Sequence, residues 1–145
     1  MMSTERTILI VDEDVDFVEA ISALLEVNGF TVLRAFDGRE GLRLAKMGRP
    51  DLIIMDIIMS ERTEGVRTVQ EIRQATERKE IPIFVVSSRY SGDEDFRTSP
   101  DSAWLTHDEF FSKPLNTLQL LEKIRQRLKN GGQARRSTVQ RQAER

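Results

Sequence analysis

Short runs of apolar residues alternate along this chain with stretches in which apolar residues recur every three or four positions. The runs cover residues 7–11, 31–35, 52–55, 83–86 and 110–112, and several of them are rich in β-branched side chains. Continuous apolar runs of this length are typical of strands that are buried on both faces of a sheet. The pattern therefore predicts five strands separated by helices.

Helical periodicity marks the stretches between and after these runs. In the first helix, apolar residues fall at i, i+4, i+7 and i+8, namely Phe17, Ile21, Leu24 and Leu25, and Asn28-Gly29 predicts its end. Asp37 and Glu40 form the pattern of a capping box that opens a short helix ending near Gly48. The third helix carries Val66, Val69 and Ile72. The last begins at the predicted cap Asn116 and carries Leu118, Leu121, Ile124 and Leu128. A helix within residues 89–109 is only weakly signalled.

Strands that alternate with helices predict an α/β fold, in which helices cover both faces of a parallel sheet in a doubly wound arrangement. We assign residues 1–130 to one folded domain. Periodicity is lost after Asn130, and residues 131–145 contain four arginines and one glutamate. We expect that segment to be a disordered basic tail.

Composition narrows the class of protein. The 145 residues are 39% hydrophobic and 32% charged, which suits one packed domain. A net charge of −2 argues against a broad basic surface for nucleic acid. The absence of cysteine excludes disulfides and thiol chemistry, and the single histidine, His107, excludes a multi-histidine metal centre. With no apolar run long enough to span a membrane and no signal peptide, we expect a cytoplasmic protein without membrane contacts.

Polar residues follow four of the predicted strands: Asp12, Asp56, Ser87 and Lys113. In open parallel sheets, ligands bind outside the carboxyl ends of the strands, so we expect these side chains to gather at one edge. The carboxylates of Asp12, Glu13 and Asp56 would repel one another unless a cation lay between them, and Mg²⁺ suits such oxygen ligands. An ammonium and a hydroxyl nearby are recurring parts of phosphoryl-transfer sites.

These residues stand in four motifs, at positions 8–14, 51–56, 81–87 and 110–114. Together the motifs resemble the receiver domain of two-component response regulators, in particular the stand-alone, chemotaxis-regulator-like members, over residues 7 to 129. The resemblance implies the flavodoxin-like receiver fold, with five strands in the order 2-1-3-4-5. It also implies a phosphoprotein of a bacterial two-component system, not an enzyme that acts on other substrates.

The resemblance implies roles for the site residues. Asp56 would accept a phosphoryl group from a sensor histidine kinase or phosphotransfer protein. Asp12 and Glu13 would hold Mg²⁺ together with Asp56 and the backbone carbonyl of Ile58.

Three further positions follow from the same resemblance. Ser87 would be the switch hydroxyl, Lys113 the lysine that pairs with the phosphoryl group, and Phe110 the aromatic residue whose rotamer reports activation. The tight turn at Lys113-Pro114, together with the resemblance, favours a cis peptide bond there.

This sequence also departs from the family pattern. Glu13 is one methylene longer than the commoner aspartate, and Ser60 stands where the family usually has proline. The loop before Gly65 is one residue longer, and the segment between Ser87 and Lys113 is also lengthened, which puts its helix in doubt.

Alternatives remain open. A haloacid-dehalogenase-like phosphatase would use Asp12 as nucleophile and Asp14 as general acid, but it would leave Asp56 without a role and lacks an acidic pair after Lys113. A flavin or dinucleotide binder would need glycines in the acidic turn that begins at Asp12. The third alternative is a receiver-like module that is not phosphorylated and acts only as a docking surface for partner proteins. Because no further domain follows residue 130, we expect output through protein–protein interaction or phosphorelay.

Overall fold

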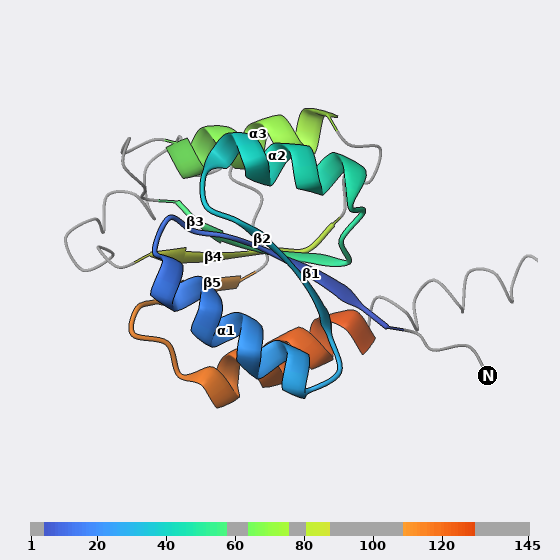
Figure 1. Cartoon of the computed structure of the whole chain (residues 1–145), viewed down its shortest axis with the longest axis vertical. Helices are drawn as coiled ribbons and strands as arrows, with labels where there is room; N and C mark the ends of the chain where they lie inside the picture. Colours follow the sequence, from blue (N-terminus) through green and yellow to red (C-terminus); the bar gives the residue numbers. More distant parts are fainter. Residues whose placement is uncertain (1–4, 58–63, 76–80, 88–108, 130–145) are drawn as a thin grey trace, which may run out of the picture. The chain divides into compact units, whose positions relative to one another are not determined.

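The computed structural model of the chain describes residues 5–57, 64–75, 81–87 and 109–129. A first compact unit ends at Leu115 and holds a five-stranded parallel sheet (Figure 1). Its strands are β1 (Thr7–Val11), β2 (Thr31–Ala35), β3 (Leu52–Asp56), β4 (Ile83–Ser87) and β5 (Glu109–Ser112), arranged in the order β2-β1-β3-β4-β5. Both the predicted α/β class and the predicted strand order are therefore confirmed.

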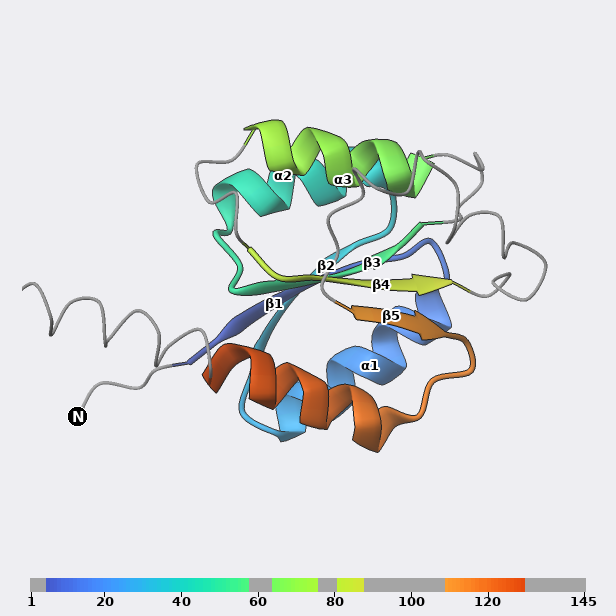
Figure 2. The same ribbon diagram turned by 180° about the vertical axis from the view of Figure 1, so that it is seen from behind.

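Helices cover both faces of this sheet. Helix α1 (Val15–Val27) lies on one face, whereas α2 (Gly38–Met47) and α3 (Glu64–Ala75) lie side by side on the other (Figures 1 and 2). Because successive side chains of a strand point to opposite faces, each strand contributes to both layers. The cluster under α2 and α3 is built from Leu9, Val11, Ala35, Ala45, Ile53, Met55, Ile57, Val66, Val69, Ile72, Ile81, Ile83 and Val85.

The predicted strands agree with the observed ones to within one residue at each end. Strands β3 and β4 are buried along their whole length. Burial on both faces explains their unbroken apolar runs, because no position of either strand points to water. Strand β1 pairs with both β2 and β3, and the middle strand β3 pairs with β1 and β4.

The face that α1 buries includes Ile21 and Leu25 as predicted, but it differs from the prediction in its other members. Its buried residues are Val18, Ile21, Ser22 and Leu25, and the predicted members Phe17 and Leu24 are only half-buried. The predicted and the observed apolar stripes of this short helix are neighbours that share residues. The spacing of apolar residues alone therefore does not show which stripe faces the sheet. Asp14 caps the helix, and Gly29 at its end has φ +92°, which favours glycine.

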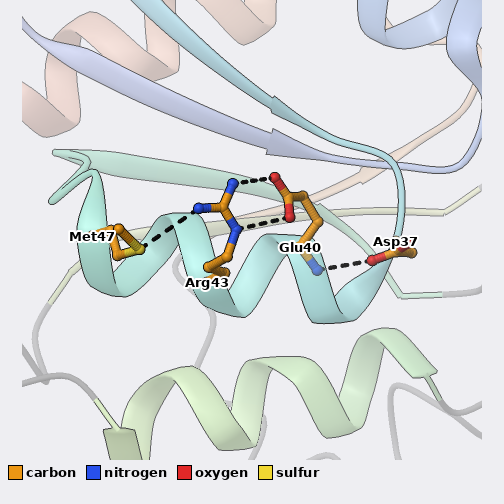
Figure 3. Close-up of polar contacts among 4 residues, drawn as sticks. All are labelled: Asp37, Glu40, Arg43 and Met47. Carbon is orange, nitrogen blue, oxygen red and sulfur yellow. Dashed lines mark hydrogen bonds and ion pairs between the residues drawn. The ribbon is translucent and has the colours of Figure 1, made fainter.

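The start of α2 shows one half of the predicted capping box. The Oδ1 atom of Asp37 accepts a hydrogen bond of 2.8 Å from the backbone N–H of Glu40 (Figure 3). Both carboxylate oxygens of Glu40 accept from the guanidinium of Arg43, at 2.9 and 2.6 Å, and Arg43 also reaches the sulfur of Met47 (Figure 3). The Glu40 side chain thus runs along the helix towards its next turn.

A second compact unit begins at Asn116 and contains a helix over residues 117–129. The Asn116 side chain accepts a hydrogen bond of 3.0 Å from the N–H of Gln119, which confirms the predicted cap. Leu118, predicted on the apolar face, is exposed, because the buried positions are Leu120, Leu121, Ile124 and Leu128.

Several predictions concern residues outside the described ranges. These are Ile58, Ser60, the loop before Gly65, the segment between β4 and β5 and the tail at 131–145. Within the described ranges, no helix has the length and apolarity needed to cross a membrane.

Candidate functional site

The carboxyl ends of four strands bring polar side chains together at one edge of the sheet. Asp12 follows β1, while Asp56 and Ser87 are the last residues of β3 and β4. All three are buried, with exposed fractions of 1%, 4% and 1%. Lys113 follows β5, and its backbone N–H donates to the carbonyl of Ser87 at 3.0 Å.

The Lys113 ammonium lies between two buried carboxylates. Its Nζ is 2.7 Å from Oδ2 of Asp12 and 3.8 Å from Oδ2 of Asp56. The lysine side chain is itself only 14% exposed. Removing carboxylates from water is costly unless a positive group compensates them, so this one ammonium stabilises both acids. Two carboxylates and one ammonium still leave a formal excess of negative charge at this edge.

The first turn of α1 also belongs to the site. The backbone N–H of Asp14 donates to Oδ1 of Asp12 at 2.9 Å, so both oxygens of that buried acid are engaged. The Lys113 Nζ lies 4.2 Å from the centroid of the Phe17 ring. The sequence did not indicate this contact of Phe17, because Phe17 also fits the apolar periodicity of the first helix. The available signal was an aromatic residue in the first turn after a strand end.

Backbone contacts fix the strand ends. The N–H of Asp12 donates to the carbonyl of Ala35 at 3.0 Å, and that of Ile57 to the carbonyl of Val86 at 3.3 Å. The Lys113–Pro114 peptide bond is cis, which confirms the prediction.

Gly65 allows the start of α3 to lie directly against the chain that follows Asp56. A Cβ atom at this position would be 2.2 Å from the Cα of Ile57 and 2.3 Å from the carbonyl oxygen of Asp56. No side chain fits at such distances from backbone atoms. Gly65 therefore fixes the backbone of Asp56, a role that the sequence analysis did not assign.

Two of the remaining predicted residues lie within the described ranges. Glu13 is exposed beside Asp12, and Phe110 is half-buried and packs against the α2–α3 core. Ile58 is outside the described residues.

A hard cation fits the donor set that the structure assembles. The carboxylates of Asp12 and Asp56 already converge on one cation, the Lys113 ammonium. Oxygen ligands of this kind suit Mg²⁺, which keeps several waters and takes one or two carboxylates from the protein. Among the described residues, no three His, Cys, Asp or Glu side chains form a group that could hold a metal. A metal ion would therefore need waters or further ligands beside this pair.

Comparison with known proteins identifies the family. The model of the response regulator receiver domain matches residues 8–125. Transcriptional regulatory protein PrrA of Mycobacterium tuberculosis is 32% identical over 129 residues, which are 89% of this chain and 52% of PrrA. The chain thus spans about half the length of the first curated relatives that it matches. Protein PilH of Pseudomonas aeruginosa is 30% identical over 81% of this chain and 93% of its own length.

Solved structures agree with this assignment. A CheY-like response regulator receiver domain protein from Methanospirillum hungatei superposes with a TM-score of 0.78 at 25% identity, covering 90% of this chain and 99% of its own. Nothing in these comparisons supports a dehalogenase-like phosphatase with Asp12 as nucleophile. The chain therefore belongs to the response regulator receiver domain family, whose members are signalling proteins.

Proposed function

We propose that this protein is a single-domain response regulator that accepts a phosphoryl group onto Asp56 from the phosphohistidine of a sensor kinase or phosphotransfer protein. The observation that carries the proposal is the buried Asp56 carboxylate with the Lys113 ammonium 3.8 Å away, at the edge where such sheets bind ligands. The similarity to PilH over 93% of its length supports a single-domain arrangement. Output would then pass to a downstream protein or along a phosphorelay.

The chemistry is a displacement at phosphorus. A carboxylate oxygen of Asp56 forms a bond to phosphorus as the bond from phosphorus to the kinase imidazole nitrogen breaks. The imidazole leaves with the electron pair and takes a proton from solvent. Lys113 then pairs its ammonium with the oxygens of the acyl phosphate, because the new anion lies beside it.

Asp12, Glu13, Asp56 and the carbonyl of Ile58 would hold Mg²⁺. When bound, this ion neutralises charge on the phosphoryl oxygens. The two carboxylates that converge on Lys113 support this assignment, because the site already accommodates a cation between them. The exposed side chain of Glu13 can supply a further ligand directly or through water.

Ser87 and Phe110 would carry the signal away from the site. The Ser87 hydroxyl, buried at the end of β4, can donate a charge-assisted hydrogen bond to the phosphoryl oxygens. Its movement would vacate space into which Phe110 turns from the neighbouring strand β5. Phenylalanine has no hydroxyl that needs a partner, so its burial costs less than that of a tyrosine.

Acetyl phosphate with Mg²⁺ tests the proposal, because a small phosphodonor needs no cognate kinase. We expect mass spectrometry to place one phosphoryl group on Asp56 and Asp56→Asn to abolish it. Asp51→Asn is the matched control, since Asp51 lies immediately before β3, near its opposite end, where it pairs with Arg6. It should label normally. An unlabelled wild type would contradict the proposal, and label on Asp12 in Asp56→Asn would favour the phosphatase.

A further inference from the structure

Four residues at the carboxyl edge of the sheet form a closed ring of contacts. Asp12 accepts a hydrogen bond from the N–H of Asp14 at 2.9 Å, and Asp14 accepts one from the N–H of Phe17 at 3.2 Å. The Phe17 ring centroid lies 4.2 Å from Nζ of Lys113. Lys113 completes the ring by donating to Asp12 at 2.7 Å. The start of α1 is thereby tied to the ammonium that lies between the two buried acids.

The contact between Phe17 and Lys113 is attractive for an electrostatic reason. The face of an aromatic ring is negative, and a cation within about 6 Å of its centroid is attracted to it. The Lys113 side chain is only 14% exposed, so water screens this attraction weakly. The hydrogen bond from the Phe17 N–H to Asp14 fixes the backbone that carries the ring.

We propose that Phe17 is a positioning residue that holds the Lys113 ammonium on Asp12 and thereby sets how readily a divalent cation gains the Asp12 carboxylate. This inference rests on the proposed function, which makes Asp12 a metal ligand. The ammonium lies on Oδ2 of Asp12, so a metal ion that binds this oxygen must displace it. Any contact that stabilises only the metal-free arrangement lowers metal affinity by the corresponding factor.

Titration of the full chain with Mg²⁺ by isothermal calorimetry measures this factor. We expect Phe17→Leu, which keeps an apolar side chain but removes the ring, to bind Mg²⁺ roughly two- to fivefold more tightly than the wild type. Phe17→Tyr keeps the ring and should bind like the wild type. Phe36→Leu is a control for loss of an aromatic residue near the same edge, after β2, and should change nothing.

A double-mutant cycle separates the ring contact from general packing. In a Lys113→Met background there is no ammonium for the ring to hold, so adding Phe17→Leu should leave the Mg²⁺ affinity unchanged. If Phe17→Leu changed the affinity equally in both backgrounds, or in neither, Phe17 would not act through Lys113. Thermal unfolding of each variant identifies any that lose the fold.

A second measurement does not depend on metal. The ring current of Phe17 should shift the NMR signals of the Lys113 side-chain methylenes upfield, and Phe17→Leu should abolish that shift while Phe36→Leu retains it. Absence of the shift in the wild type would overturn the contact itself. A wild type that binds no Mg²⁺ would instead contradict the proposed function together with the metal role of Phe17. Binding that Phe17→Leu leaves unchanged would contradict this inference alone.

Discussion

Lys113 has a role in the fold in addition to the chemical role proposed for it. Its ammonium is the positive group that the structure places against the buried carboxylates of Asp12 and Asp56. A side chain that compensates buried charge has a stability effect that an exposed lysine lacks, because surface ion pairs contribute little.

Lys113→Met should therefore lower the free energy of unfolding at neutral pH by about 3 kcal/mol, since it removes the ammonium from beside two buried acids. Urea denaturation with and without Mg²⁺ measures the effect, and we expect Mg²⁺ to restore much of the loss. Lys46→Met, at an exposed position of α2, is the control and should change little. A Lys113→Met protein as stable as the wild type would show that the ammonium does not stabilise the acids.

Gly65 is a residue where one methyl group should affect the site. Gly65→Ala places a Cβ atom within 2.3 Å of backbone atoms of Asp56 and Ile57, so α3 or the end of β3 must shift. We expect a stability loss of about 1–3 kcal/mol from overpacking, and slower labelling of Asp56 by acetyl phosphate.

Gly29→Ala is the control that separates a general loss of stability from a specific effect on the labelling of Asp56. It also destabilises, because Gly29 has φ +92° at the far end of α1, but a Cβ there meets no atom within 4 Å. It should label at the wild-type rate. Equal labelling rates in both variants would show that Gly65 does not position Asp56.

At the scale of elements, the exposed ion pair on α2 gives a pH-dependent prediction. The hydrogen bonds from Arg43 lower the pKa of Glu40. The pKa of Glu40 is therefore lower in the folded than in the unfolded protein. The ion pair stabilises the helix at pH values above the pKa that Glu40 has in the unfolded protein. That contribution is lost as the pH falls through the pKa of Glu40 in the folded protein.

Glu40→Gln should thus be slightly less stable than the wild type at neutral pH and equally stable in acid. Chemical denaturation at several pH values checks this, and high salt should shrink the neutral-pH difference because both side chains are exposed. If the stability difference between Glu40→Gln and the wild type persisted unchanged in acid, it would come from helix propensity and not from the ion pair.

The strands were easier to predict than the faces of the helices. A run buried on both sides, such as β3, is apolar from its first residue to the last but one, so hydropathy predicted its bounds to within the terminal residue Asp56. A short helix offers two overlapping apolar stripes, which is why Phe17 and Leu118 were assigned to buried faces. Choosing between stripes needs the packing surface, which the local sequence does not contain.

The site residues also divide into those that the sequence pattern predicts and those that depend on packing. Asp12, Asp56 and Lys113 were predictable because parallel strands deliver their carboxyl ends to one edge. The roles of Phe17 and Gly65 were not, because each depends on a close approach that the apolar pattern does not show. The ring of Phe17 meets a lysine, and Gly65 meets a strand end, only once the sheet is assembled.

For the whole molecule, phosphorylation should alter Phe110 while the strand order stays unchanged. Phe110 is half-buried, so its ring has solvent exposure to lose if it turns inward. A fluorine-labelled Phe110 observed by NMR with and without beryllofluoride should report a more buried ring in the bound form. Labelled Phe84, fully buried in β4, is the control and should report no change. Equal ring exposure of Phe110 in both forms would exclude it as a switch.

The order of the strands has a consequence for synthesis on the ribosome. Strands β1, β2 and β3 are neighbours, so three of the five strands can assemble from the first 56 residues, which already include both buried acids. The ammonium that compensates Asp12 lies 101 residues further along the chain. A nascent chain that has emerged only as far as β3 therefore carries these carboxylates at its sheet edge without the Lys113 ammonium. Arrival of β5 completes the sheet, and Lys113 directly after it brings an ammonium to these acids, which favours the complete fold over its amino-terminal half.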